Sequence, residues 1–236
     1  MKINKYFYLI LILVIQISYT MKVIHIMPGG LYGFYMFGVC KFIKENYNLN
    51  DYIFYGASAG SWNSLYMCLK SNNDKKFIES IIQETNKHNN LQELQINIKN
   101  NLLDHYTERD FDFTKLHITL CTLEKNPLFL KKNIVNDFDN LEDAINCCIA
   151  SSHIPLLCGN LYHVYKMHKC IDGGIFRKPF SYYKNKPKLV IDYELWKNNK
   201  IKNHNSLQRN NLRILFDEGY KDSIKNKYIL DEIFRK

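Results

Sequence analysis

The stretch of this 236-residue chain that points most directly to chemistry is Gly-Ala-Ser-Ala-Gly at residues 56–60. It follows the apolar run 52–55 and precedes a segment whose apolar residues have helical spacing. A strand that turns sharply into a helix holds the residue at its apex in a strained, accessible conformation, and side chains two positions away would collide with the crossing backbone. Gly56 and Gly60 therefore indicate a nucleophile elbow with Ser58 at its apex; a plain structural turn is the alternative.

A serine hydroxyl needs a base to remove its proton, and Asp172 is the best-placed candidate. It follows the predicted strand 161–171 and precedes Gly173 and Gly174, which let the backbone turn tightly around it. We expect a carboxylate at the carboxyl end of a strand to lie on the same sheet edge as Ser58. Burial would raise its affinity for a proton and make it a better base.

An acyl-transfer site also needs donors for a developing oxyanion, and residues 28–33, Pro-Gly-Gly-Leu-Tyr-Gly, could supply them. They follow an apolar run and precede a helical segment, so the main-chain N–H groups of Gly29, Gly30 and Gly33 would project at the same edge. Such a loop alone could equally bind a phosphate. Pro28 has no N–H to donate.

Histidine is the usual base for a serine nucleophile, and in α/β-hydrolases it follows both the nucleophile and the acid. After Asp172 the sequence has only His204, in a basic Asn-rich stretch, while His153 could also lie near the site. A His-dependent hydrolase therefore stays an alternative. Cys147 and Cys148 lack the spacing of metal ligands, and we expect no metal.

Apolar runs rich in β-branched residues alternate with segments of helical periodicity along the chain. We predict strands at 22–27, 52–55, 116–123, 127–132, 161–171 (two strands if it bends) and 188–195, and helices at 33–46, 59–70, 73–98, 140–152 and 212–234. The alternation predicts one α/β domain over residues 21–236, with a mostly parallel sheet covered on both faces.

Residues 1–20 have the pattern of a secretory signal peptide. Lys2 and Lys5 precede the apolar core 6–15, and Ser18 and Thr20 are small residues at a cleavage spacing. We expect cleavage after Thr20 and a secreted or membrane-associated protein. An uncleaved anchor, a buried first strand and an intracellular peripheral membrane protein are the alternatives. The seven cysteines lie in apolar surroundings and could be buried thiols or disulfides.

The formal net charge of +9 becomes +7 without the leader, and much of the excess lies in residues 197–213. We expect this basic segment, through Lys197, Lys200, Lys202, Arg209 and Arg213, to bind an anionic membrane surface. A solvated basic face is the alternative. Nothing in the sequence resembles a recognition helix or a zinc finger, so no nucleic-acid partner is expected.

The glycine loop, the Gly-x-Ser-x-Gly elbow and the Asp-Gly-Gly turn, in this order, resemble the patatin-like phospholipase family. GGLYGFYMFGVC, YGASAGSWNSL and CIASSHIPLLCG are similar to the family's loop-and-helix segment, its elbow, and the segment before its aspartate. EGYKDSI resembles the segment that closes the catalytic domain in the animal-type branch. The resemblance covers residues 21 to about 229.

This resemblance implies a three-layer α/β/α fold with a mostly parallel central sheet and a Ser58–Asp172 dyad that uses no histidine, metal or cofactor. It implies an oxyanion hole and supporting turns built from Gly29, Gly30, Gly33, Gly56, Gly60, Gly173 and Gly174. The implied activity is hydrolysis of acyl esters of glycerolipids, of the phospholipase A or lysophospholipase type. Pro28 stands where the family's glycine run usually begins, and residues 175–179 lack its usual polar pair. A catalytically weak lipid-binding protein is therefore the alternative.

Overall fold

Short apolar strands form the centre of the molecule. The computed structural model describes residues 21–70, 74–84, 91–125, 128–175, 186–197 and 212–235. Strand β1 (Lys22–Ile26) pairs in parallel with β2 (Tyr52–Ala57) on one side and with β7 (Leu189–Ile191) on the other. β3 (Leu116–Lys125) continues the parallel arrangement beside β2. Residues 23–26 of β1 are buried, as expected for an apolar strand between two parallel neighbours.

Strand β3 carries three neighbours because two of them share one of its edges. β4 (Leu128–Val135) runs antiparallel along one whole edge. On the other edge β2 pairs with the first half of β3, and β6 (His168–Ile171) pairs antiparallel with the second half. Ala57 lies opposite Thr119, and Ile171 lies opposite Cys121. The carboxyl ends of β2 and β6 therefore approach each other head-on.

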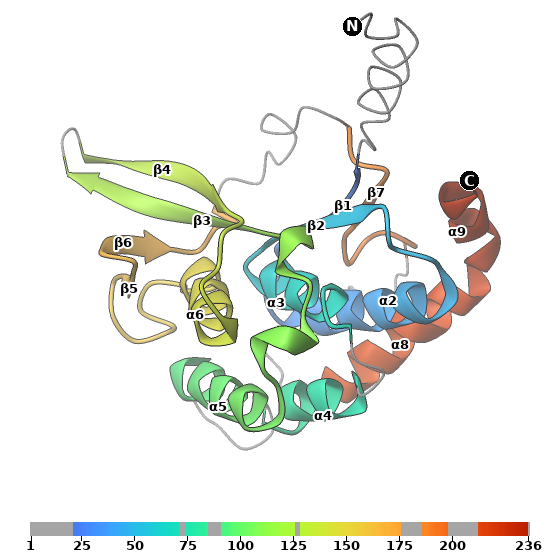
Figure 1. Cartoon of the computed structure of the whole chain (residues 1–236), viewed down its shortest axis with the longest axis horizontal. Helices are drawn as coiled ribbons and strands as arrows, with labels where there is room; N and C mark the ends of the chain where they lie inside the picture. The colour runs from blue at the N-terminus through green and yellow to red at the C-terminus, as the bar shows by residue number, and fades with distance from the viewer. Residues whose placement is uncertain are drawn as a thin grey trace, which may run out of the picture.

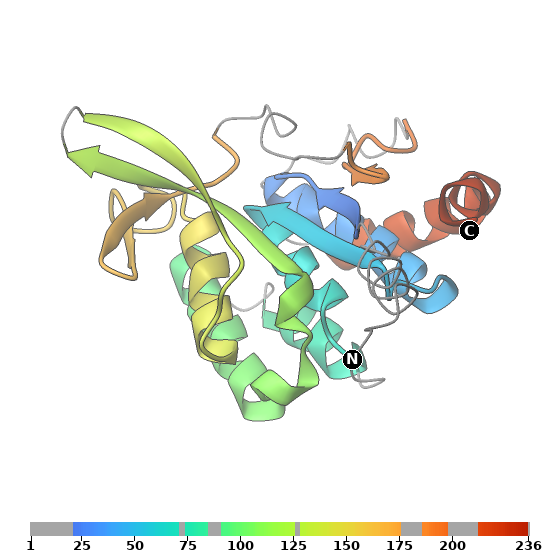
Figure 2. The same cartoon turned by 45° about the horizontal axis from the view of Figure 1, so that its top comes forward.

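The described helices pack in successive layers, the first against the strands and the next against those helices. α3 and α6 pack against the strands, α2 packs on α3, α5 on α6 and α8 on α2; Figures 1 and 2 show α3 and α6 against the same face of the sheet. Their bounds are α2 Gly33–Asn46, α3 Ala59–Met67, α4 Asp74–Glu84, α5 Leu91–His105, α6 Leu141–Ser151, α8 Leu212–Lys225 and α9 Lys227–Phe234. Short 3-10 turns lie at Gly30–Tyr32, Glu108–Asp110 and Phe113–Lys115. The mixed α/β architecture with a mostly parallel central sheet is the one expected from the sequence.

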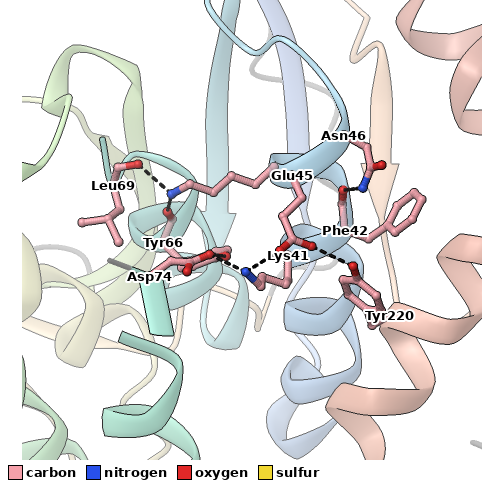
Figure 3. A network of polar contacts seen from close by, with 9 residues as sticks. Lys41, Phe42, Glu45, Asn46, Tyr66, Leu69, Asp74 and Tyr220 are labelled. Atoms are coloured by element: carbon pink, nitrogen blue, oxygen red, sulfur yellow. Dashed lines mark hydrogen bonds and ion pairs between the residues drawn. The ribbon is translucent and has the colours of Figure 1, made fainter. Parts of the chain in front are cut away.

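A network of polar side chains fastens α2 to its neighbours (Figure 3). The ammonium of Lys41 lies 2.6 Å from Asp74 at the start of α4 and 2.7 Å from Glu45. Lys44 donates hydrogen bonds to the carbonyl oxygens of Tyr66 and Leu69, at and just beyond the end of α3. These contacts fix the helix that follows the elbow from the end opposite Ser58.

Two of the predicted elements differ from the structure in extent, and a third follows the two-strand alternative given for it. The segment 73–98 holds two helices, α4 and α5, and the second continues to His105. The strand predicted at 188–195 is confined to Leu189–Ile191 and is followed by a turn. The segment 161–171 forms two antiparallel strands, β5 (His163–Tyr165) and β6, in agreement with the predicted bend.

Two predicted segments fall outside the described residues: the leader 1–20 and most of the basic segment, residues 198–211. Among the residues that are described, no helix has both the length and the apolar character needed to cross a membrane.

Candidate active site

Ser58 stands at a strained turn between β2 and α3. Its φ of 54° and ψ of −127° lie where non-glycine residues are rarely found, as expected for the apex of a nucleophile elbow. A side chain at Gly56 would collide with the backbone of Gly60, and one at Gly60 with the carbonyl of Ile26. Close backbone approach therefore leaves no room for a side chain at either glycine.

Asp172 meets Ser58 directly. The Ser58 hydroxyl donates a hydrogen bond of 2.6 Å to Oδ2 of Asp172, and the Gly174 N–H donates one of 2.6 Å to Oδ1. Burial raises the pKa of Asp172 above its ordinary value of 3.8, although these two hydrogen bonds and the nearby His153 oppose the rise. The Gly174 N–H thus orients the carboxylate through Oδ1, while Oδ2 accepts the hydrogen bond from the serine.

The sequence led us to expect Asp172 at the carboxyl end of a strand, on the same sheet edge as Ser58. Strand β6, which ends one residue before Asp172, is instead antiparallel to β3. The two residues meet because β2 and β6 end head-on along one edge of β3. Gly173 fits there because a side chain at this position would collide with the carbonyl oxygen of Thr119.

Ser151, at the end of α6, joins the two halves of the site and was not singled out from the sequence. Its hydroxyl accepts a 2.9 Å hydrogen bond from the Ser58 N–H and donates a 2.6 Å bond to the carbonyl oxygen of Thr119. Its own carbonyl oxygen accepts from the Gly173 N–H at 2.8 Å, and that of His153 accepts from the Asp172 N–H at 2.9 Å. Ser151 is fully buried. One short segment therefore fixes the backbone of both Ser58 and Asp172.

The glycine loop lies beside this pair. Gly29, Gly30 and Gly33 line the same pocket as Ser58 and Asp172. The N–H of Gly33 donates to the carbonyl oxygen of Gly30 within the 3-10 turn, and a side chain at Gly33 would collide with Ala59. A side chain at Gly174 would likewise collide with the ring of Pro28. Pro28 thus packs against the turn whose N–H orients Asp172.

A pocket of about 670 Å³ opens over Ser58. Its lining is largely apolar and comes from the glycine loop, helices α2 to α5 and the loop after α6, including Phe34, Trp62, Leu94 and Leu156. The Trp62 indole N–H and the Gln95 amide both donate to the hydroxyl of Ser152, at 3.1 and 2.9 Å. A pocket of this size and character suits a small molecule with a long apolar part.

The histidine near the site, His153, makes its ring contacts with Asn160 and His163. His153 is buried, its Nε2 lies 2.9 Å from the carbonyl oxygen of Asn160, and its ring packs 5.9 Å from that of His163. Burial lowers the pKa of His163, with His153 and Lys99 adding to the effect. Ser58 Oγ donates to Asp172, so the geometry provides a carboxylate as the partner of the serine.

All seven cysteines are buried free thiols, which decides between the two alternatives left by the sequence. Burial raises the pKa of Cys121 to about 11 and that of Cys148 to about 12, so both stay protonated near neutral pH. Within the described ranges no group of three or more His, Cys, Asp or Glu side chains is placed to hold a metal ion.

The family model described as patatin-like phospholipase matches residues 29–182, well over half of the chain. The chain belongs to the patatin-like phospholipase family. No curated protein matches it significantly. Membership supports lipid acyl hydrolysis and lipid substrates at the level of the family, and the matched range includes the loop, Ser58 and Asp172. Placement in the animal-type branch stays a prediction.

Proposed function

We propose that this patatin-like protein is a serine acyl hydrolase of glycerolipids, of the phospholipase A or lysophospholipase type. The single observation that supports it best is the 2.6 Å hydrogen bond from the Ser58 hydroxyl to the buried carboxylate of Asp172. A carboxylate whose pKa is raised by burial is a stronger base than one in water, which suits the activation of an alcohol.

In the proposed reaction Ser58 Oγ attacks the carbonyl carbon of the acyl ester while its proton passes to Asp172. The main-chain N–H groups of Gly29 and Gly30 stabilise the resulting oxyanion. We leave Gly33 out of this role because its N–H already donates to Gly30. Collapse of the tetrahedral intermediate breaks the ester C–O bond, and the leaving alcohol takes the proton from Asp172.

Water completes the cycle. Asp172 accepts a proton from the water molecule as its oxygen attacks the carbonyl carbon of the Ser58 acyl ester. Breakdown of this second intermediate releases the fatty acid, and the proton on Asp172 returns to Ser58 Oγ. The partial positive charge at the start of α3 favours the negative charge that develops in both steps.

A fluorophosphonate probe tests the assignment, because it bonds covalently to an activated serine. The wild-type protein should be labelled and should release fatty acid from a mixed lipid extract, as followed by mass spectrometry. Ser58→Ala should do neither. Ser61→Ala is the matched control, since Ser61 is a buried serine three residues along whose hydroxyl donates to the Ser58 carbonyl oxygen. Labelling that survives in Ser58→Ala would contradict the proposal.

The alternative of a catalytically weak lipid-binding protein rests on Pro28, which removes one N–H from the loop. It predicts lipid binding without turnover, so hydrolysis that depends on Ser58 excludes it. The packing of Pro28 against Gly174 gives the proline a supporting role beside Asp172 that is compatible with activity.

A further inference from the structure

Exposed apolar side chains gather at one border of the Ser58 pocket. Five of the exposed large apolar residues in the described part of the chain lie within residues 156–167, and together we call them the apolar rim: Leu156, Leu157, Leu161, Val164 and Met167. Met167 is 94% exposed and Leu156 75%. Leu156 and Leu157 also line the pocket, so the rim continues into it.

The backbone holds these side chains outward. Leu156 and Met167 have φ angles of 69° and 67°, in the left-handed region that residues with a side chain rarely adopt. Such conformations persist only where the surrounding structure fixes them, and they concentrate at functional sites. The loop is anchored inside by buried Cys158, whose N–H donates to the carbonyl oxygen of Ile154, and by the contact of His153 with Asn160.

The β5–β6 hairpin presents the rest of the rim on one of its faces. Tyr165 is buried on the side that packs against α6, whereas Val164 and its cross-strand neighbour Lys169 point outward. In Figures 1 and 2 the hairpin lies at the periphery of the molecule beside α6. Met167 stands in the turn at its tip.

The charges of the hairpin already have partners. The Lys166 ammonium lies 2.7 Å from the carboxylate of Asp143, and the Lys169 ammonium lies 4.3 Å from the centre of the Tyr162 ring. Apolar contact, more than net charge, is therefore what this surface offers to a partner.

We propose that the apolar rim enters the interfacial layer of a phospholipid bilayer, and that Leu156 and Leu157 form the passage from the bilayer to Ser58. The inference rests on the proposed hydrolysis of glycerolipids. An acyl chain that crossed water on its way to the pocket would expose its apolar surface, at a cost proportional to the area. A rim continuous with the pocket removes that cost, because the acyl chain passes directly from the bilayer to the pocket. An interface with another protein would not require this continuity.

Site-specific fluorescence tests whether the rim inserts. Tryptophan is introduced by Met167→Trp at the rim and by Ile224→Trp on α8, where Ile224 is 53% exposed. Both changes are made in the full chain carrying Ser58→Ala, so no turnover is involved. Vesicles of phosphatidylcholine brominated on the acyl chains should quench the added emission of Met167→Trp and leave that of Ile224→Trp unchanged. Equal quenching at both positions, or none at Met167→Trp, overturns the inference.

A kinetic experiment tests whether insertion serves catalysis. The rim variant Leu161→Ser, Val164→Thr, Met167→Ser changes only side chains outside the pocket lining. Its hydrolysis of neutral phosphatidylcholine vesicles should fall about tenfold, and that of a soluble short-chain ester should stay unchanged. The matched control Ile214→Gln, Ile224→Gln, Tyr228→Gln removes three exposed apolar side chains of α8 and α9 and should keep both activities.

The outcomes separate this inference from the proposed function. Loss of vesicle hydrolysis in the α8–α9 control as well would overturn the assignment to the rim. If the rim variant hydrolyses vesicles normally, the inference is overturned and the surface has no role in reaching the bilayer. If the rim variant changes from dimer to monomer in sedimentation, the inference is overturned because the surface binds a second copy of the chain. Absence of ester hydrolysis in the wild type refutes the proposed function. Quenching at Met167→Trp still decides whether the rim inserts, because that experiment involves no turnover.

Discussion

Each reacting residue is held by a partner that the catalytic motif does not contain. Ser151 is the clearest case, because its hydroxyl bridges the Ser58 N–H and the Thr119 carbonyl oxygen in a fully buried position. Ser58 has a strained backbone, and a strained residue keeps its conformation only while its neighbours determine it. Ser151 therefore acts as a positioning residue for the nucleophile.

Ser151→Ala should lower kcat about tenfold or more while leaving KM nearly unchanged, because it leaves the Ser58 N–H and the Thr119 carbonyl without their partner. Initial rates on a soluble ester measure both constants. Ser151→Thr, which keeps the hydroxyl, should recover part of the rate. The matched control is Ser223→Ala, where another fully buried hydroxyl bonds to the Gly219 carbonyl on α8. An equal loss of kcat in both alanine variants would reduce Ser151 to a stability role.

Asp172 should set both the pH dependence and a cost in stability. Its folded-state pKa is raised by burial, so kcat should fall as pH decreases through a value above 3.8. The same shift means that the folded state binds more protons than the unfolded state in that range, and ionisation at higher pH destabilises the fold.

Asp172→Asn should therefore lose most turnover. Its midpoint temperature of unfolding at pH 7 should be equal to or above that of the wild type, because the variant carries no buried charge at this position. Any such gain should disappear below pH 3.8, where the wild-type carboxyl is protonated in both states. Thermal unfolding at several pH values measures this. Asp222→Asn is the control, because Asp222 is a buried carboxylate that pairs with Tyr35 and Lys225 away from the site. It should keep activity and lose stability. A clear destabilisation by Asp172→Asn at pH 7 would contradict the prediction.

At the scale of elements, the sequence predicted the elbow and the alternation of strands and helices because both depend on local signals. Gly56 and Gly60 mark close backbone approach, and apolar periodicity marks each buried face. The division of 73–98 was also readable: the apolar side chains of α4 end at Ile82, and those of α5 begin at Leu91. Their separation of nine positions places these two side chains about half a turn apart at 3.6 residues per turn. One straight helix could not bury both.

The direction of β6 was not readable in the same way. Strand pairing depends on contacts between residues far apart in the chain, and nothing local distinguishes a parallel neighbour of β3 from an antiparallel one. The bond between Ser151 and Ser58 spans 93 positions and had no sequence signal either. What was missed is therefore the non-local part of the site.

The polar network around α2 gives a prediction at the same scale (Figure 3). Burial lowers the pKa of Lys41, but hydrogen bonds to Asp74 and Glu45 outweigh this effect and leave it above 10.5. A raised lysine pKa stabilises the fold below 10.5, and that contribution is lost as pH rises through the folded value.

Lys41→Met should destabilise the protein at pH 7 by about 1–3 kcal/mol, because it removes the ammonium from two partly buried carboxylates and leaves them with their hydrogen bonds from Tyr66 and Tyr220. Urea unfolding monitored by circular dichroism measures this, and the difference from wild type should shrink at pH values above the folded pKa. Lys75→Met, on the surface of α4 where the side chain is 84% exposed, should change little. Equal effects of the two substitutions would show that the network adds nothing beyond a surface pair.

For the whole molecule, the question is how a strongly basic chain, with a predicted leader at residues 1–20, reaches its substrate. The first described residue is Met21, and β1 begins one residue later, at Lys22. Cleavage after Thr20 would therefore leave the central strand intact. Neither the leader nor a secretory location is established by the fold, and both stay predictions.

The basic segment 197–213 gives the last prediction, which concerns long-range attraction. Of its five cationic residues the structure describes Lys197 and Arg213, and Arg213 is already paired with Asp217 at 3.2 Å. Replacing Lys197, Lys200, Lys202, Arg209 and Arg213 by Gln should weaken binding to anionic vesicles at low salt and spare hydrolysis of a soluble short-chain ester. Moderate salt should have the same effect on the wild type, since exposed charges are screened within about 8–10 Å. Vesicle co-sedimentation measures both.

Neutral vesicles separate this segment from the apolar rim. Contact by apolar side chains has no net charge to screen, so the Gln variant should bind phosphatidylcholine vesicles as the wild type does, at every salt concentration. The rim variant should show the opposite pattern, with reduced binding to neutral vesicles and little change in salt dependence on anionic ones. If the Gln variant loses neutral binding or ester hydrolysis as well, the segment belongs to the fold. If anionic binding is unchanged, it is only a solvated face.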